Sequence, residues 1–166
     1  TQCVDALNVV FSERGSVRQR DGINNLTSAL TNAASTLTPY YRTGGNPQIV
    51  AGCGTRVEAI ATDGTVNASA TGLTTGTWGF ARFGTPGNEV VYAGQGSTNL
   101  NKWDGSAWTT AISSTPEAGS LAVMPVSNRL VAGRFNTTTG GPTGAASTSS
   151  PSHVYFSDAG DPETWT

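Results

Sequence analysis

Charged residues are scarce in this chain of 166 residues. Only 12% are Asp, Glu, Lys or Arg, and the formal net charge is −2. A charge this small gives no general attraction to nucleic acid or to an anionic membrane. No apolar run approaches the roughly 20 residues that a membrane-spanning helix needs, so we expect no membrane insertion.

The residues on which most catalytic motifs depend are also scarce. Histidine and lysine each occur once, as His153 and Lys102. The chain contains no Gly-x-Ser-x-Gly, no phosphate-binding loop with a lysine and no His-Glu-x-x-His. We therefore expect no enzymatic activity, no cofactor and no metal.

Two smaller groups of residues allow more than one interpretation. Cys3 and Cys53 have no metal-ligand spacing, and they are either one disulfide or, as we favour, two buried thiols. Asp158, Asp161 and Glu163 crowd one loop and could bind Ca²⁺, but Asp-Ala-Gly-Asp-Pro is also typical of a turn, which we favour.

What the chain has in quantity is glycine, threonine, serine and alanine, with four tryptophans and five phenylalanines. This composition suits a β protein with many turns. The most informative stretch runs from Glu89 to Trp108. Val90-Val-Tyr92 is typical of a strand, and Asp104-Gly105 between two short runs predicts a hairpin with a two-residue type I′ turn.

Parts of this stretch recur along the chain. Gln48-Ile-Val-Ala-Gly-Cys-Gly54 resembles Val90-Val-Tyr-Ala-Gly-Gln-Gly96 at an offset of about 41 to 42 residues, and Arg129-Leu-Val-Ala-Gly133 follows after about 39 more. A period near 40 residues, with several short strands in each unit, is the signature of a β-propeller blade. The sequence therefore predicts an all-β, propeller-like fold of which about two to three blades are visible.

The chain divides into three predicted regions. Residues 1–22 form an N-terminal β-hairpin arm, with strands at Ala6–Phe11 and Ser16–Arg20. Residues 23–47 connect it to the repeats; apolar residues between Ile23 and Leu37 fit either a short helix or a loop with a strand. Residues 48–166 form the propeller-like domain, which we expect to be truncated at its C-terminal end and to carry a long Thr/Gly/Ser loop at 136–152.

Three stretches together resemble the tail proteins of tailed bacteriophages. Leu7–Gly22 is similar to their opening strand, Arg-Gly turn and Arg-x-Arg second strand. Asn101-Lys-Trp-Asp-Gly-Ser-Ala-Trp108 resembles their blade hairpins. The third stretch, Asn128-Arg-Leu-Val-Ala-Gly133 and then His153-Val-Tyr-Phe-Ser-Asp-Ala-Gly-Asp-Pro-Glu-Thr-Trp165, resembles a recurrent strand-loop-strand.

The resemblance implies a non-enzymatic structural protein of the virion tail, in the nozzle, tail tube or neck-to-tail region, assembled in the host cytoplasm. It implies a homo-oligomeric ring, often sixfold, docked to adjacent tail or neck proteins around a DNA channel, without sequence-specific DNA contact. Arg14, Arg18 and Arg20 on the hairpin arm are the candidate inter-subunit contacts.

The alternative is a host-surface or carbohydrate-binding propeller used in adsorption. Trp78, Trp103, Trp108 and Trp165 would then offer stacking faces to sugar rings, whereas we favour them as anchors in the cores of the blades. A glycosidase would need two carboxylates about 5 to 10 Å apart in a cleft. We do not favour it; it would require a hydrolysis that is lost on changing Asp158 or Asp161.

Overall fold

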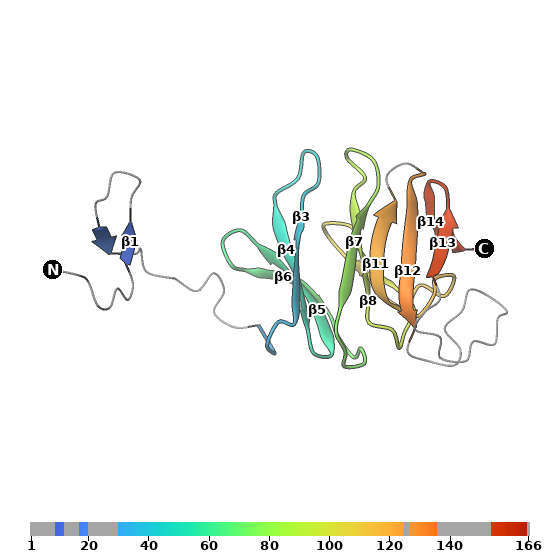
Figure 1. Cartoon of the computed structure of the whole chain (residues 1–166), viewed down its shortest axis with the longest axis horizontal. Helices are drawn as coiled ribbons and strands as arrows, with labels where there is room; N and C mark the ends of the chain where they lie inside the picture. The colour runs from blue at the N-terminus through green and yellow to red at the C-terminus, as the bar shows by residue number, and fades with distance from the viewer. Residues whose placement is uncertain (1–8, 12–16, 20–29, 125–126, 136–153, 166) are drawn as a thin grey trace.

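The computed structural model describes residues 9–11, 17–19, 30–124, 127–135 and 154–165. In this part of the chain every regular element is a β-strand, so the all-β prediction is confirmed. Strands β3 to β14 form three antiparallel sheets of four strands each, which stand side by side in chain order (Figure 1).

Each sheet is built from four strands that are consecutive in the sequence. The first sheet contains β3 (Thr36–Tyr40), β4 (Gln48–Cys53), β5 (Arg56–Ala61) and β6 (Val66–Ala70). The second contains β7 (Gly79–Phe83), β8 (Val90–Gly94), β9 (Asn101–Trp103) and β10 (Trp108–Thr109). The third contains β11 (Ala118–Met124), β12 (Arg129–Phe135), β13 (Val154–Asp158) and β14 (Asp161–Trp165).

The expected N-terminal strand pair is present. Strand β1 (Val9–Phe11) pairs antiparallel with β2 (Val17–Gln19), and Val10 lies opposite Arg18. These two strands form a sheet of their own.

The segment at 23–47, expected to be a connection, contributes to the first sheet. Residues 30–35 are irregular, and Thr36–Tyr40 then forms β3, which pairs with β4 along its whole length. Thr36 and Thr38 have low helix preference and good strand preference, whereas Leu37 favours a helix. Of the two predicted interpretations, a loop with a strand is therefore the one observed at 30–40.

The repeated motif occupies the same place in each sheet. Ile49-Val-Ala-Gly52, Val91-Tyr-Ala-Gly94 and Leu130-Val-Ala-Gly133 all lie on the second strand. The motif's alanine is fully buried in all three sheets, as Ala51, Ala93 and Ala132. The sequence repeat is therefore also a structural repeat.

Two apolar cores hold the three sheets together. Tyr40, Val50 and Ala59 of the first sheet pack with Val91 and Trp103 of the second. The opposite face of the second sheet packs on the third through a cluster that includes Tyr92, Leu100, Leu130 and Trp165; its other buried members are Ala81, Phe83, Ala118 and Ala132. The alternation of strand side chains puts successive residues of β8 into different cores.

Glycine allows the sheets to approach closely. A Cβ at Gly52 would lie 2.5 Å from the Trp78 ring, and one at Gly79 would lie 2.5 Å from the carbonyl oxygen of Gly119 on β11. Real Cβ atoms do not come this close to other heavy atoms, so β7 and β11 lie side by side only because Gly79 has no side chain.

The Asp104-Gly105 hairpin forms, but its predicted two-residue turn is wrong. Trp103 pairs with Trp108, so the loop has four residues, 104–107. The Asp104 carboxylate accepts hydrogen bonds from the backbone amides of Ser106 (2.8 Å) and Ala107 (2.7 Å). Of the two central residues only Gly105 has a positive φ, 97°. An Asp side chain that bonds the backbone two residues on has replaced the type I′ turn.

Candidate functional site

The arginines predicted as inter-subunit contacts lie largely outside the described residues. Arg14 and Arg20 are not among them, and of Arg18 only the backbone is described, in β2 opposite Val10. Cys3, His153 and the 136–152 loop also lie outside the described residues.

Three of the four tryptophans are buried between sheets. Trp78, Trp103 and Trp165 are at most 7% exposed. The Nε1–H of Trp78 donates to the Gly54 carbonyl (3.2 Å), that of Trp103 to Gln48 Oε1 (2.9 Å) and that of Trp165 to the Pro162 carbonyl (2.9 Å). A buried tryptophan whose N–H is satisfied contributes packing area and fixes one orientation.

The fourth tryptophan, Trp108, packs beside Trp103. Their ring centroids are 5.2 Å apart at an interplanar angle of 37°. Trp108 is half-buried, and its buried Nε1 has no hydrogen-bond partner. Both rings belong to the core between the first and second sheets.

A depression that carries polar groups lies between the second and third sheets. It has a volume of about 300 Å³ and is lined by Phe83, Gly84, Thr85, Asn88, Val90, Tyr92, Lys102, Asn128, Gly160, Asp161, Pro162 and Glu163. Its walls come from the β7–β8 loop, from β8 and β9, and from the β13–β14 hairpin. We expected Asp161 and Glu163 in one loop, and this is wrong, because both lie on strand β14. No local pattern in the sequence pairs Tyr92 and Lys102 with them.

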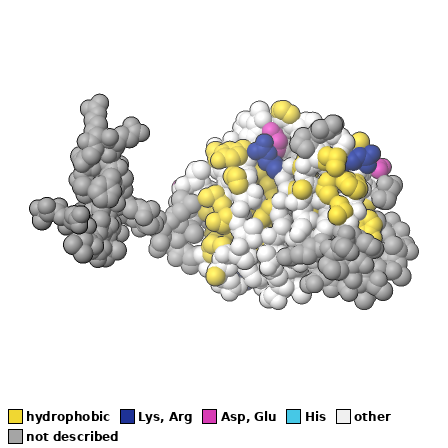
Figure 2. Space-filling view, in the orientation of Figure 1, with side chains coloured by type: hydrophobic (Ala, Val, Ile, Leu, Met, Phe, Trp, Pro, Cys, Tyr) yellow, Lys and Arg dark blue, Asp and Glu magenta, His cyan; other side chains and the backbone are white. Residues whose placement is uncertain are grey.

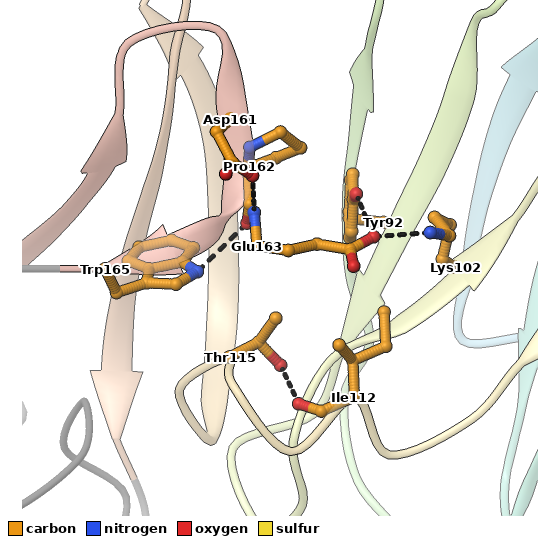
Figure 3. Close-up of polar contacts among 8 residues, drawn as sticks. All are labelled: Tyr92, Lys102, Ile112, Thr115, Asp161, Pro162, Glu163 and Trp165. Atoms are coloured by element: carbon orange, nitrogen blue, oxygen red, sulfur yellow. Dashed lines mark hydrogen bonds and ion pairs between the residues drawn. The ribbon is translucent and has the colours of Figure 1, made fainter.

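Glu163 joins the two sheets at this depression (Figure 3). Its Oε1 accepts a hydrogen bond from the Tyr92 hydroxyl at 2.9 Å and forms an ion pair with Lys102 Nζ. Burial, together with the negative charge of Glu163, raises the pKa of Tyr92 well above its ordinary value. Tyr92 therefore stays protonated and acts as a donor.

The adjacent Asp161 carboxylate binds groups of its own hairpin. Asp161 Oδ1 accepts from the Glu163 amide (3.0 Å) and Oδ2 from the Thr164 hydroxyl (2.8 Å). The Glu163 amide, followed by the Thr164 hydroxyl, lowers the pKa of Asp161. Among the described residues no group of three His, Cys, Asp or Glu side chains converges as metal ligands would. The geometry at Asp161 is that of the turn we favoured.

A second polar network joins the first sheet to the second. Glu89 accepts hydrogen bonds from the Thr43 hydroxyl (2.7 Å), the Thr43 amide (3.2 Å) and the Gly87 amide (2.8 Å). The Thr43 hydroxyl is the largest cause that lowers the pKa of Glu89, to about 2. Arg42 adds two bonds to carbonyls of the second sheet's loops, those of Gly87 and Asp104.

One buried acid was not singled out by sequence analysis. Glu58 on β5 is 2% exposed; its Oε1 accepts from the Thr31 hydroxyl at 2.9 Å, and its Oε2 has no hydrogen-bond partner. The neighbouring Cys53 is a buried free thiol, and burial, then the charge of Glu58, raises its pKa. The sequence feature that could have identified this buried acid is Glu58 itself, a glutamate within the otherwise apolar run Val57–Ile60.

The comparisons with known proteins give no relative. No protein-family model, curated protein or solved structure matches the chain. In the described residues no helix is long and apolar enough to cross a membrane. The function must therefore be inferred from the residues of this chain. The polar groups found between its sheets bind one another, and these contacts hold each sheet against the next.

Proposed function

We propose that this chain is a non-enzymatic structural component of a bacteriophage tail, acting through ring self-association and docking to adjacent tail proteins around the DNA channel. Its three sheets would be consecutive blades of a propeller-like domain. The hairpin arm with Arg14, Arg18 and Arg20 would reach a neighbouring subunit.

One observation carries the blade arrangement. The Ala-Gly motif lies on the second strand of three successive four-stranded sheets, and each motif alanine is buried. Four consecutive antiparallel strands per unit, with neighbouring units packed face to face, are what a blade requires. The support for the tail role is the resemblance of Leu7–Gly22, Asn101–Trp108 and His153–Trp165 to phage tail proteins.

The contacts between sheets are of the kind that a structural role needs. Glu163 binds Tyr92 and Lys102 across one interface, and Glu89 binds Thr43 across the other. A carboxylate with two or three donors holds its neighbours in one orientation, which suits a rigid structural part. The glycan-binding alternative loses support, because Trp78, Trp103 and Trp165 have no exposed face for a sugar ring.

Immuno-electron microscopy of intact phage particles tests the proposal. Antibodies raised against the purified chain should label the tail or the neck-to-tail region. Label on the capsid alone, or no label on particles that contain the protein by mass spectrometry, would contradict a tail role. Binding of the isolated chain to a glycan array would favour the adsorption alternative.

A further inference from the structure

The depression between the second and third sheets combines apolar and polar lining. Its volume of about 300 Å³ is at the lower end of the range for ligand pockets, roughly 300 to 1,000 Å³. Its larger apolar residues are Phe83, Val90 and Pro162. Its polar side chains are those of Thr85, Asn88, Tyr92, Lys102, Asn128, Asp161 and Glu163. A lining of this kind suits a group with an apolar stem and a polar tip.

Two backbone hydrogen bonds hold the loops around the depression in place. The Asn88 amide donates to the Thr85 carbonyl at 2.8 Å and closes the β7–β8 loop. The Gly160 amide donates to the Asn128 carbonyl, also at 2.8 Å, and ties the β13–β14 hairpin to the β11–β12 turn. The depression is therefore formed before any group enters it, which lowers the cost of ordering on binding.

The charges that line the depression do not balance. Among the described residues of its lining, Lys102 is the one basic side chain, whereas Asp161 and Glu163 are both acidic. Lys102 and Tyr92 both bind Oε1 of Glu163, so Oε2 takes no part in either contact (Figure 3). The Glu163 side chain is 35% exposed, and a group from outside can reach it. A cationic donor is the group that this lining favours.

The excess of acid continues toward the first sheet. A second depression, of about 170 Å³, shares Asn88 and Val90 with the first and is also lined by Arg42, Glu89 and Asp104. Both lie at the edge of the sheets that carries the β7–β8 loop, at the top of Figure 1. Figure 2 shows charged side chains at two places in the upper half of the face in view, in each case a basic one beside an acidic one.

The hairpin arm carries the complementary charge. Arg14, Arg18 and Arg20 lie within 14–20, a segment without an acidic residue, and they are three of the nine basic residues of the chain. The guanidinium group of arginine is planar, pairs with carboxylates through two donors at a time and sits on an apolar stem. Strand β1 lies beyond the first sheet, on the side away from the depression (Figure 1). The arm of another copy is therefore a better placed source of an arginine than the chain's own arm.

We propose that the depression between the second and third sheets of one copy binds an arginine of the hairpin arm of a second copy. The guanidinium group pairs with Glu163 Oε2 and the Asp161 carboxylate, and its stem lies against Phe83 and Pro162. The inference rests on the proposed function, in which the arm reaches a neighbouring subunit, and names the place where the arm binds.

Sedimentation velocity of the full chain tests the depression. We expect the wild type to self-associate, and the association to weaken as salt is added, because the pairing is ionic. Thr85→Lys adds an ammonium group to the lining and should weaken the association by about tenfold or more, since like charges repel. Thr85 is exposed, so its replacement should spare the fold. Thr74→Lys is the matched control, because Thr74 is an exposed threonine in the β6–β7 loop, at the other end of β7. Its association should equal that of the wild type.

A second variant tests the arm. Replacing Arg14, Arg18 and Arg20 together with glutamine should abolish the association, since it removes the cations and leaves the depression intact. The Thr85→Lys chain keeps its arm and the arm variant keeps its depression, so a mixture of the two should form a one-to-one dimer although neither associates alone. In that mixture, NMR should show shifted side-chain amide signals of Asn88 and Asn128 in the arm variant.

Circular dichroism of each variant checks that the chain is folded. A monomeric wild type, an association that survives Thr85→Lys or the arm variant, an equal loss in Thr74→Lys, or a mixture that stays monomeric would each overturn the inference. Tail labelling by antibody with a monomeric chain would overturn only the inference and leave the proposed function standing. Association through the depression in a protein that is absent from the tail would overturn only the proposed function.

Discussion

Single residues decide how closely the sheets pack, and Gly52 is the clearest case. In Gly52→Ala the new Cβ would meet the Trp78 ring at 2.5 Å, and the ring is 2% exposed and hydrogen-bonded to Gly54. We expect the free energy of unfolding to fall by about 1–3 kcal/mol, the usual cost of overpacking a core. Chemical denaturation followed by tryptophan fluorescence measures the change.

Gly76→Ala is the control for this substitution. The nearest atoms to a Cβ at Gly76 lie 3.4 Å away, which is close to ordinary contact. Its stability should stay within a few tenths of a kcal/mol of the wild type, as substitutions away from packed features usually do. Equal losses for the two variants would show that the Trp78 contact is not the cause.

Glu89 gives the chain an acid-sensitive connection between the first two sheets. Its pKa is lowered from 4.5 to about 2, chiefly by the Thr43 hydroxyl. A carboxyl with a lowered folded-state pKa stabilises the fold above its unfolded pKa and loses that contribution as the pH falls through the folded pKa. We therefore expect stability to fall between about pH 4.5 and pH 2, and Glu89→Gln to weaken this dependence.

The titration of Glu89 itself checks the cause. Carbonyl-detected NMR should show a midpoint near 2 in the wild type and a higher midpoint in Thr43→Val, which removes the hydroxyl donor but keeps the side-chain shape. A wild-type midpoint at the ordinary value of 4.5 would contradict the hydrogen bonds described for this carboxylate.

At the scale of elements, the β13–β14 hairpin depends on Asp161. Its carboxylate holds the Glu163 amide and the Thr164 hydroxyl, and Glu163 in turn reaches the second sheet. Asp161→Ala should lower the free energy of unfolding by about 1 kcal/mol, a modest loss because the carboxylate is exposed and its hydrogen bonds compete with water. Amide hydrogen exchange at Glu163 should accelerate.

Asp158→Ala, at the other end of the same turn, is the matched control. We expect it to leave the exchange rate of the Glu163 amide unchanged, because that amide bonds to Asp161. Added Ca²⁺ should not alter the stability of the wild type if the acidic residues form a turn. A Ca²⁺-dependent rise that is lost in Asp161→Ala would restore the metal-binding interpretation.

Most strands could be predicted, because β-branched and aromatic runs bounded by glycine lie in short pieces along the chain. Strand β3 was harder: Thr36–Tyr40 contains Pro39 and follows a stretch with apolar residues at helical spacing. Proline is tolerated here because β3 is the edge strand of its sheet. The turn at Asp104 was predicted in the right place but with the wrong type, since its side-chain bonds to the backbone compete with the type I′ geometry.

At the scale of the whole molecule, two shared cores should make the three sheets unfold together. The second sheet packs on the first through Trp103 and on the third through Tyr92. Neither the first nor the third sheet can therefore unfold separately without exposing the apolar side chains that it shares with the second. We expect one thermal transition, with coincident curves from far-ultraviolet circular dichroism and from tryptophan fluorescence. Two separated transitions would show that the sheets are independent units.

The sequence by itself determined the strand content, the repeat and the absence of familiar catalytic motifs. These depend on residue type and on spacing along the chain: the Ala-Gly motif, the β-branched runs and the single histidine and lysine can be read without coordinates. Local chemistry of this kind also predicted the turn at Asp158–Asp161.

The tertiary structure alone decided which residues meet across sheets. Tyr92 and Glu163 are 71 positions apart, and Thr43 and Glu89 are 46 apart. No local pattern pairs them, because their contact depends on how one whole sheet is placed on the next. The burial of Trp78, Trp103 and Trp165 likewise follows from sheet stacking.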